Sequence, residues 1–129
     1  MAGGQHPYFT SGLSWHVHLA DGLAEAREHG LRIFLQHGHR LCSGTRALVE
    51  RTLAKEEVAE VMAKHFVCVA SDADQLEPDV AALIAQLPRK EPTPLCIYLD
   101  GDGRLLTSTA GGRPPAVLLN DMLSATPRR

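Results

Sequence analysis

The sequence contains few cysteines, and they do not form pairs. Only three are present, Cys42, Cys68 and Cys96, and they lie far apart along the 129 residues. An odd number at such spacing is not the disulfide framework of small secreted domains. The cysteines therefore indicate a protein of a reducing compartment.

The chain also lacks long apolar runs and an excess of either charge. No apolar stretch approaches the ~18 residues that a membrane-spanning helix needs, so we expect no membrane partner. Thirteen Lys and Arg residues are interspersed with fifteen Asp and Glu residues, for a net charge of −2. Without a basic stripe, nucleic acid is not an expected partner. The N-terminus shows no pattern of a secretory signal, and the sequence therefore predicts a cytoplasmic location.

The composition is that of one globular domain. A chain of this length buries roughly two-thirds of its unfolded surface, and 44% of its residues are hydrophobic. Residues 1–13 are Gly-rich and polar, which predicts a flexible N-terminal arm and leaves residues 14–126 for the domain. We find no internal repeat and no linker.

Short apolar runs alternate with longer stretches of helical periodicity. The short runs predict strands at 31–36, 66–70, 95–99 and 104–110. The longer stretches predict helices at about 19–29, from 42 or 43 to 53, 55–64, 77–86 and from 114 or 115 onward. Asp100–Gly103 predicts a tight hairpin turn. This order predicts an α/β fold, with a mixed central sheet and helices on both faces.

One cysteine lies at a strand-to-helix junction. Cys42 falls within the stretch from His37 to Thr45, between a predicted strand and a predicted helix. A helix N-terminus favours an anion, and Arg40 and Arg46 flank the thiol, so Cys42 is predicted to form a thiolate easily. The alternative is a packed thiol in a binding domain without catalysis.

Thr45 lies three residues after Cys42, on the same face of a helix. Its hydroxyl is placed either to hydrogen-bond the Cys42 thiolate or to bond the backbone of its own helix. The sequence leaves both open.

Several motifs occur together in a familiar order. They are Trp15 with Leu23-Ala24-Glu25-Ala26-Arg27, then Ile33-Phe34-Leu35, Leu41-Cys42-Ser43-Gly44-Thr45, Phe66-Val67-Cys68-Val69 with Asp72, Thr93-Pro94, Tyr98-Leu99-Asp100-Gly101-Asp102-Gly103-Arg104 and Gly111. With these motifs in this order, the chain resembles the thioredoxin-like superfamily, and most of all its bacterial single-domain branch. The resemblance implies a thioredoxin-like fold with Cys42 as the attacking thiol.

The resemblance also implies a surface for the partner chain. Pro94 matches the position of the superfamily's cis-proline, where the preceding backbone, here at Thr93, binds extended substrates. The resemblance implies that Leu41 and Ser43, on either side of Cys42, also bind the substrate. The expected partners are protein or peptide thiols and disulfides.

The chain departs from the family at the second thiol. The family usually has Cys-x-x-Cys, whereas this chain has Cys42-Ser43-Gly44-Thr45. A threonine cannot attack a mixed disulfide, so the two-thiol cycle is excluded. The sequence thus predicts a monothiol protein that exchanges disulfides through Cys42, with glutathione as a candidate co-substrate and no resident cofactor. The alternative is a non-catalytic module that holds a peptide beside Cys42 and Pro94.

Metal binding is a weaker hypothesis. His37, His39 and Cys42 carry ligand atoms that suit Zn or Cu, but they leave a fourth ligand unspecified. An iron–sulfur cluster bridging two chains through Cys42 is similarly weak, because Cys-Ser-Gly-Thr is not the glutaredoxin motif.

The remaining histidines and cysteines are given no role in a site. His16 and His18 are expected to lie in the arm or at a strand edge, without partners. Cys68 and Cys96 fall in apolar strands and are expected to be buried.

Overall fold

The computed structural model describes residues 14–39 and 43–125. The predicted arm, residues 1–13, lies outside the described residues, as do Leu41 and Cys42, so the domain boundaries stay a prediction.

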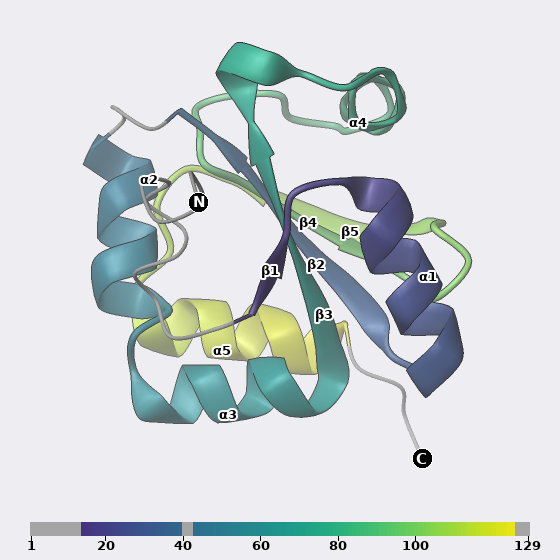
Figure 1. The fold of residues 1–129 in the computed structure, drawn as a ribbon. Helices are drawn as coiled ribbons and strands as arrows, with labels where there is room; N and C mark the ends of the chain where they lie inside the picture. The colour runs from purple at the N-terminus through teal and green to yellow at the C-terminus, as the bar shows by residue number, and fades with distance from the viewer. Residues whose placement is uncertain (1–13, 40–42, 126–129) are drawn as a thin grey trace, which may run out of the picture.

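The described residues form a five-stranded mixed sheet in the order β1-β3-β2-β4-β5 (Figure 1). The strands are β1 (Trp15–His16), β2 (Arg32–Gly38), β3 (Phe66–Asp72), β4 (Leu95–Leu99) and β5 (Leu105–Ala110). The first three are parallel, β4 runs antiparallel to β2, and β5 runs antiparallel to β4.

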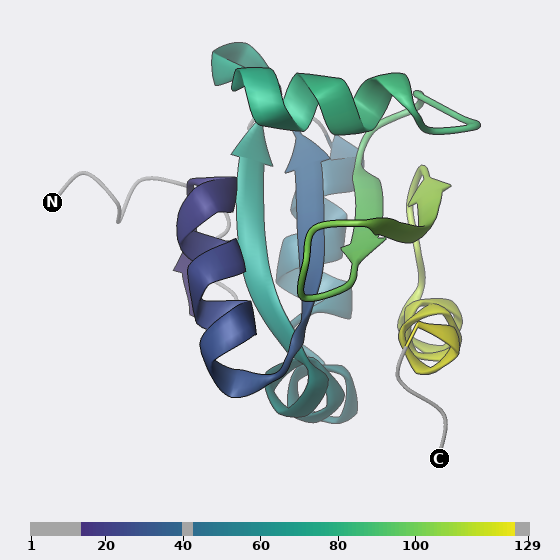
Figure 2. The same cartoon turned by 90° about the vertical axis from the view of Figure 1, so that its right-hand side faces the viewer.

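Helices cover both faces of this sheet (Figures 1 and 2). They are α1 (Leu19–His29), α2 (Ser43–Ala47), the π-helix η3 (Leu48–Thr52), α3 (Glu56–His65), the 3-10 helix η4 (Ala73–Gln75), α4 (Pro78–Ala85) and α5 (Pro115–Ser124). The predicted α/β class, with a mixed sheet between helical layers, is therefore confirmed.

Side-chain alternation along β2 divides the core into two layers. Ile33 and Leu35 pack with residues of α1 and α4, whereas Phe34 packs with residues of η3, α3 and α5. All three are fully buried, because a central strand is covered on both faces. The Phe34 and Tyr98 rings lie 5.4 Å apart between their centroids, which joins β2 to β4 in the second layer.

Three elements differ from the expectation, and one of them, the short η4, lies where the sequence predicted no helix. The pair of residues in β1 was not predicted as a strand, because two residues carry no readable alternation. The helix expected to run to residue 53 changes character at η3, where the Leu53 amide donates to the Leu48 carbonyl at 2.8 Å. A hydrogen bond between residues five apart widens one turn of the helix. An apolar pattern with a period of 3.6 residues does not reveal this widening.

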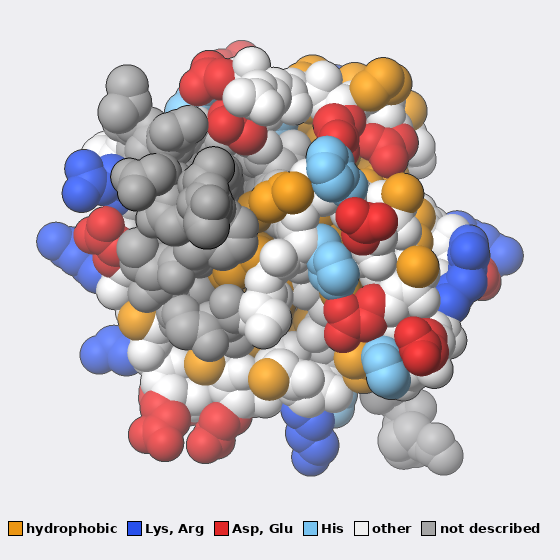
Figure 3. Space-filling view, in the orientation of Figure 1, with side chains coloured by type: hydrophobic (Ala, Val, Ile, Leu, Met, Phe, Trp, Pro, Cys, Tyr) orange, Lys and Arg blue, Asp and Glu red, His pale blue; other side chains and the backbone are white. Residues whose placement is uncertain are grey.

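The expectation that His16 and His18 have no partners is wrong. His16 Nε2 lies 2.5 Å from Glu25 Oε1, and His18 Nδ1 lies 2.6 Å from Glu77 Oε2. Figure 3, in the orientation of Figure 1, shows histidine and acidic side chains next to one another on the face toward the viewer. The partners come from α1 and from the residue before α4, so only the folded chain brings them together.

Among the described helices, none combines the length and apolar character needed to cross a membrane.

Candidate functional site

The sheet brings three segments that are distant in sequence to one end. The residue before β4, Pro94, adjoins the last residues of β2, because His37 pairs with Leu95. The Gly111 amide, just after β5, donates to the Pro94 carbonyl at 3.0 Å. Since α2 begins at Ser43, a few residues beyond the end of β2, the residue that precedes α2 in the sequence is Cys42. We take this end of the sheet as the candidate site.

Thr45 is fully buried in α2, against the end of β2. A methyl group on Gly38 would collide with the hydroxyl oxygen of Thr45, which would lie too close to the added carbon for any real contact. A residue without a side chain is therefore required where the helix approaches the strand. The Thr45 hydroxyl has no hydrogen-bond partner among the described residues. Both alternatives for Thr45 stay predictions, because the carbonyls three and four residues before it belong to Cys42 and Leu41, which lie outside the described residues.

Gln36 is a second buried polar residue near this end, and it was not among the site residues predicted from the sequence. Its side chain is fully buried, and neither its amide nitrogen nor its amide oxygen has a partner in the described part of the chain. It lies two residues from Phe34 along β2, hence on the same face as Phe34. A glutamine within an otherwise apolar run was the available signal, because buried polar groups normally find partners.

His37 does not supply a positive charge near neutral pH. Its side chain is 7% exposed, and its Nδ1 lies 2.8 Å from Ser71 Oγ. Burial is the main cause that lowers the pKa of His37 below its ordinary value, and the charge of His39 adds to this while Asp72 opposes it. The imidazole is therefore neutral at pH 7 and does not act as a cation beside a thiolate.

The metal hypothesis gains no support from the described residues. His37 Nδ1 is engaged by Ser71, and the exposed His39 lies with its Nδ1 3.4 Å from Asp74 Oδ1. In residues 14–39 and 43–125, no three or more His, Cys, Asp or Glu side chains form a group that could hold a metal. The proposed set also needs Cys42, which lies outside that range.

The predicted partner-binding residues occupy different environments. The peptide bond between Thr93 and Pro94 is cis, Pro94 is buried, and Thr93 is half-buried. Ser43, at the start of α2, is exposed. Pro94 is therefore packed into the base of the site, whereas Ser43 is accessible to a partner.

A groove continues from this site between α2 and the start of α5. It has a volume of about 400 Å³ and is lined by Gly44, Ala47, Leu48, Arg51, Thr52, Gly112, Arg113, Pro114 and Pro115. We call it the α2–α5 groove. The sequence does not reveal this groove, because its two walls lie about 60 residues apart in the chain.

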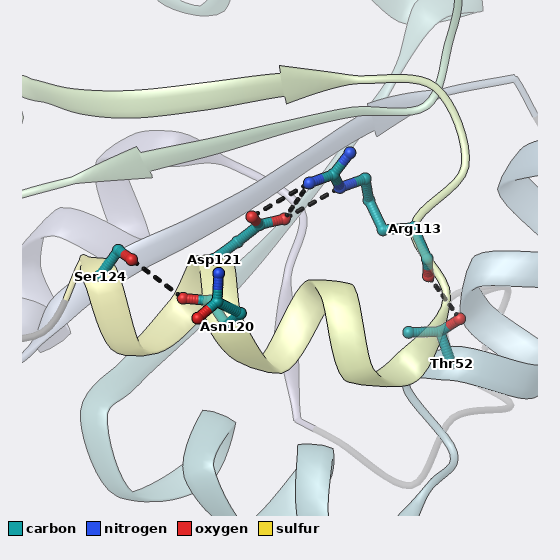
Figure 4. A network of polar contacts seen from close by, with 5 residues as sticks. All are labelled: Thr52, Arg113, Asn120, Asp121 and Ser124. Carbon is teal, nitrogen blue, oxygen red and sulfur yellow. Dashed lines mark hydrogen bonds and ion pairs between the residues drawn. The ribbon is translucent and has the colours of Figure 1, made fainter.

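A polar network holds one wall of this groove in place (Figure 4). The Arg113 side chain donates from Nε to Asp121 Oδ2 at 2.9 Å and from Nη2 to Asp121 Oδ1 at 3.0 Å. The Thr52 hydroxyl donates to the Arg113 carbonyl at 2.7 Å. The loop between β5 and α5 is thus tied to both η3 and α5.

The other two thiols are buried, as predicted. Cys68 and Cys96 are free cysteines within β3 and β4. Burial is the main cause that raises the pKa of each thiol to about 12. Neither is therefore a nucleophile at neutral pH.

Comparison with known proteins places this geometry in context. The model of the family described as "Thioredox_DsbH: Protein of unknown function, DUF255" matches residues 5–113. A thioredoxin from Thermus thermophilus has a TM-score of 0.72 at 21% identity, over 87% of this chain and 85% of its own.

Two further solved structures have a similar fold. A disulphide isomerase from Xylella fastidiosa Temecula1 has a TM-score of 0.67 at 20% identity, over 82% of this chain and 86% of its own. A structure described as DsbH oxidoreductase has a TM-score of 0.62 at 20% identity, over 88% of this chain and 83% of its own. At these identities the likeness shows the fold, and the predicted thioredoxin-like fold is confirmed. No curated protein matches the chain.

Proposed function

The chain belongs to the thioredoxin-like family described as Thioredox_DsbH, and on this basis we propose that it exchanges thiols and disulfides through the single cysteine Cys42. The observation that carries the proposal is the Thr45 hydroxyl, buried three residues after Cys42 without a partner among the described residues. An unpaired buried hydroxyl costs about 1–3 kcal/mol, and a thiolate beside it would accept its hydrogen bond.

The proposed reaction begins with the Cys42 thiolate. It attacks one sulfur of a partner disulfide, so that a bond between Cys42 and that sulfur forms as the partner's sulfur–sulfur bond breaks. The other partner sulfur leaves as a thiolate and takes a proton from water. Thr45 cannot resolve the mixed disulfide, because it has no thiol.

Release then requires an external thiol, for which glutathione is the candidate. Its thiolate attacks the partner sulfur of the mixed disulfide, and Cys42 leaves as a thiolate ready for another cycle. The partner then carries the external thiol. We place this chemistry in a reducing compartment such as the cytoplasm, where free thiols are abundant.

The partner chain needs a surface beside Cys42. We assign this surface to Thr93 and Pro94 on one side and to Leu41 and Ser43 on the other. Support comes from Pro94, which adjoins the end of β2 and is tied to Gly111 by its carbonyl.

The proposal is tested by the pH dependence of Cys42 alkylation with iodoacetamide. The expected midpoint lies below the ~8.5 of an ordinary thiol, because the hydroxyl and the helix start favour the anion. Treatment with oxidised glutathione should add one glutathione, mapped to Cys42, and none to a Cys42→Ser variant. A midpoint near that of an ordinary thiol would overturn the proposal.

A second candidate is a binding module that does not use the thiol. The α2–α5 groove favours it, since a groove of about 400 Å³ is able to hold a side chain without covalent chemistry. Cys42→Ser separates the two functions. Partners captured as reducible conjugates should disappear in this variant under the first proposal and persist as non-covalent complexes under the second.

A further inference from the structure

We propose that the α2–α5 groove binds a large apolar side chain of the partner protein and that Arg51, at its rim, pairs with a carboxylate of the same segment. This specificity rests on the proposed function, in which an extended partner chain lies beside Cys42. It adds to that function a substrate class, namely segments that combine an apolar and an acidic residue.

The polar side chains within the groove are already satisfied. The Thr52 hydroxyl donates to the Arg113 carbonyl, and the Arg113 guanidinium is held by both oxygens of Asp121 (Figure 4). The remaining side chains of the walls are those of Ala47, Leu48, Pro114 and Pro115. A polar ligand group would lose its water there without gaining a hydrogen bond from these side chains, which disfavours it. The groove therefore favours an apolar side chain over a polar one.

Arg51 differs from the other arginines around it. It is exposed, lines the groove and makes no ion pair with any residue in the described ranges. Arg46, by contrast, lies with its Nη2 3.6 Å from Glu50 Oε2 and does not line the groove. The free guanidinium is complementary to a carboxylate, which it can bind through two parallel hydrogen bonds.

The groove also continues from the proposed reaction site. Gly44, which lines it, is the second residue after Cys42 in the sequence. On the other wall, Gly112 follows Gly111, whose amide bonds the Pro94 carbonyl. A partner chain that reacts at Cys42 and lies along Pro94 thus needs only one or a few further residues to reach the groove.

The experiment uses the full chain and three peptides of equal length, each with one cysteine activated as a thionitrobenzoate disulfide. The first carries Leu two residues and Glu four residues from the cysteine, the second has Ser for Leu, and the third has Lys for Glu. Each peptide is made in two versions, one with these two residues before the cysteine and one with them after it. In the favoured direction, the Leu-Glu peptide should release thionitrobenzoate roughly ten-fold faster than the Ser-Glu peptide and about three-fold faster than the Leu-Lys peptide.

Two variants test the walls and the rim. A carbon added to Gly112 meets no atom within 4 Å, so the chain has room for a side chain to begin there, and Gly112→Leu should occupy the groove and abolish the preference for Leu. Arg51→Glu should reverse the preference between Glu and Lys. Arg46→Glu is the matched control and should leave both preferences as in the natural chain.

Equal rates for the three peptides in both directions would overturn the inference, as would a Leu preference that survives Gly112→Leu. The reaction with oxidised glutathione tests the proposed function separately, since glutathione has no large apolar side chain. If Cys42 proves unreactive, the same peptides with Ser in place of Cys are compared by fluorescence anisotropy. Tighter binding of the Leu-Glu peptide then upholds the groove, and equal binding rejects it.

Discussion

At the scale of single residues, the molecule carries buried polar groups that its core does not satisfy. Thr45 and Gln36 are fully buried, and their side-chain polar atoms have no partners among the described residues. Each such group costs stability, since its hydrogen bonds to water are lost without replacement. Conflict of this kind with core packing is characteristic of functional sites.

Replacement of Thr45 by Val separates stability from chemistry. Val has nearly the same shape, so at a pH well below the alkylation midpoint of Cys42, where no thiolate accepts from the hydroxyl, Thr45→Val should raise the free energy of unfolding by about 1 kcal/mol because no orphaned hydroxyl remains. Under the proposed function, it should also raise the pKa of Cys42. Urea unfolding and the alkylation midpoint measure the two effects. Thr107→Val, at an exposed position of β5, is the control. Lower stability in Thr45→Val would contradict the absence of a partner.

His37 predicts a loss of stability in acid. Its pKa is lowered in the folded chain, so below the ordinary value of 6.5 the unfolded chain takes up the proton first. The contribution of His37 to stability is therefore complete above pH 6.5 and decreases as the pH falls toward the folded pKa. Urea unfolding between pH 8 and pH 5 should show a shallower decline for His37→Gln than for the natural chain. The exposed His29→Gln is the control, and equal slopes in all three proteins would refute the prediction.

At the scale of elements, α5 is joined to η3 through the loop that precedes it. Arg113 and Asp121 are 25% and 16% exposed, so their ion pair is largely removed from water. The Thr52 hydroxyl, at the end of η3, completes the connection. This network sets the width of the α2–α5 groove, since both Arg113 and Thr52 line it.

Loss of the Asp121 charge should destabilise this connection. Asp121→Asn leaves the Arg113 guanidinium without its counter-charge, at an expected cost of about 2 kcal/mol in the free energy of unfolding. Asp102→Asn is the matched control, because Asp102 lies 3.9 Å from Arg27 in a pair that is mostly exposed and should change little. Urea denaturation of both variants checks the difference. Equal effects would show that the buried pair does not anchor α5.

At the scale of the whole molecule, one of the two apolar layers buries two of the three thiols. Cys68 and Cys96 lie in the layer that η3, α3 and α5 cover, and burial raises their pKa to about 12. A buried thiol of this kind reacts only when the structure opens.

The thiols therefore report on folding as well as function. At pH 7.5, intact mass spectrometry after iodoacetamide treatment should show one modification in the native protein and three in urea, with Cys42 modified first. In the Cys42→Ser variant, the native protein should show none. Modification of Cys68 or Cys96 at the rate of Cys42 without denaturant would show that the core layers open too readily to protect them.

The elements that follow from neighbouring residues were predicted well from the sequence. The run Leu95–Leu99 forms β4 with the predicted bounds, because an apolar segment of that length between Pro and Asp-Gly suits a buried strand. The turn after it follows from Asp100, whose Oδ1 accepts from the amides of Asp102 and Arg104, and from Gly103, whose φ is +88°. These interactions lie within a few residues, so the local sequence determines them.

The site depends on residues that only the fold brings together. Cys42 and Thr45 were predicted as site residues from their place at a strand-to-helix junction, and Pro94 from the resemblance to the thioredoxin-like superfamily. The structure describes Thr45 and Pro94. The sequence did not indicate that Gly38 admits Thr45 into the core, that Arg113 pairs with Asp121, or that a groove follows. Sequence by itself determined most of the helices and strands and the place of Cys42 directly before a helix, because these need only neighbours. Tertiary structure alone decided which polar groups are satisfied and which surface a partner meets, because each depends on contacts between distant segments.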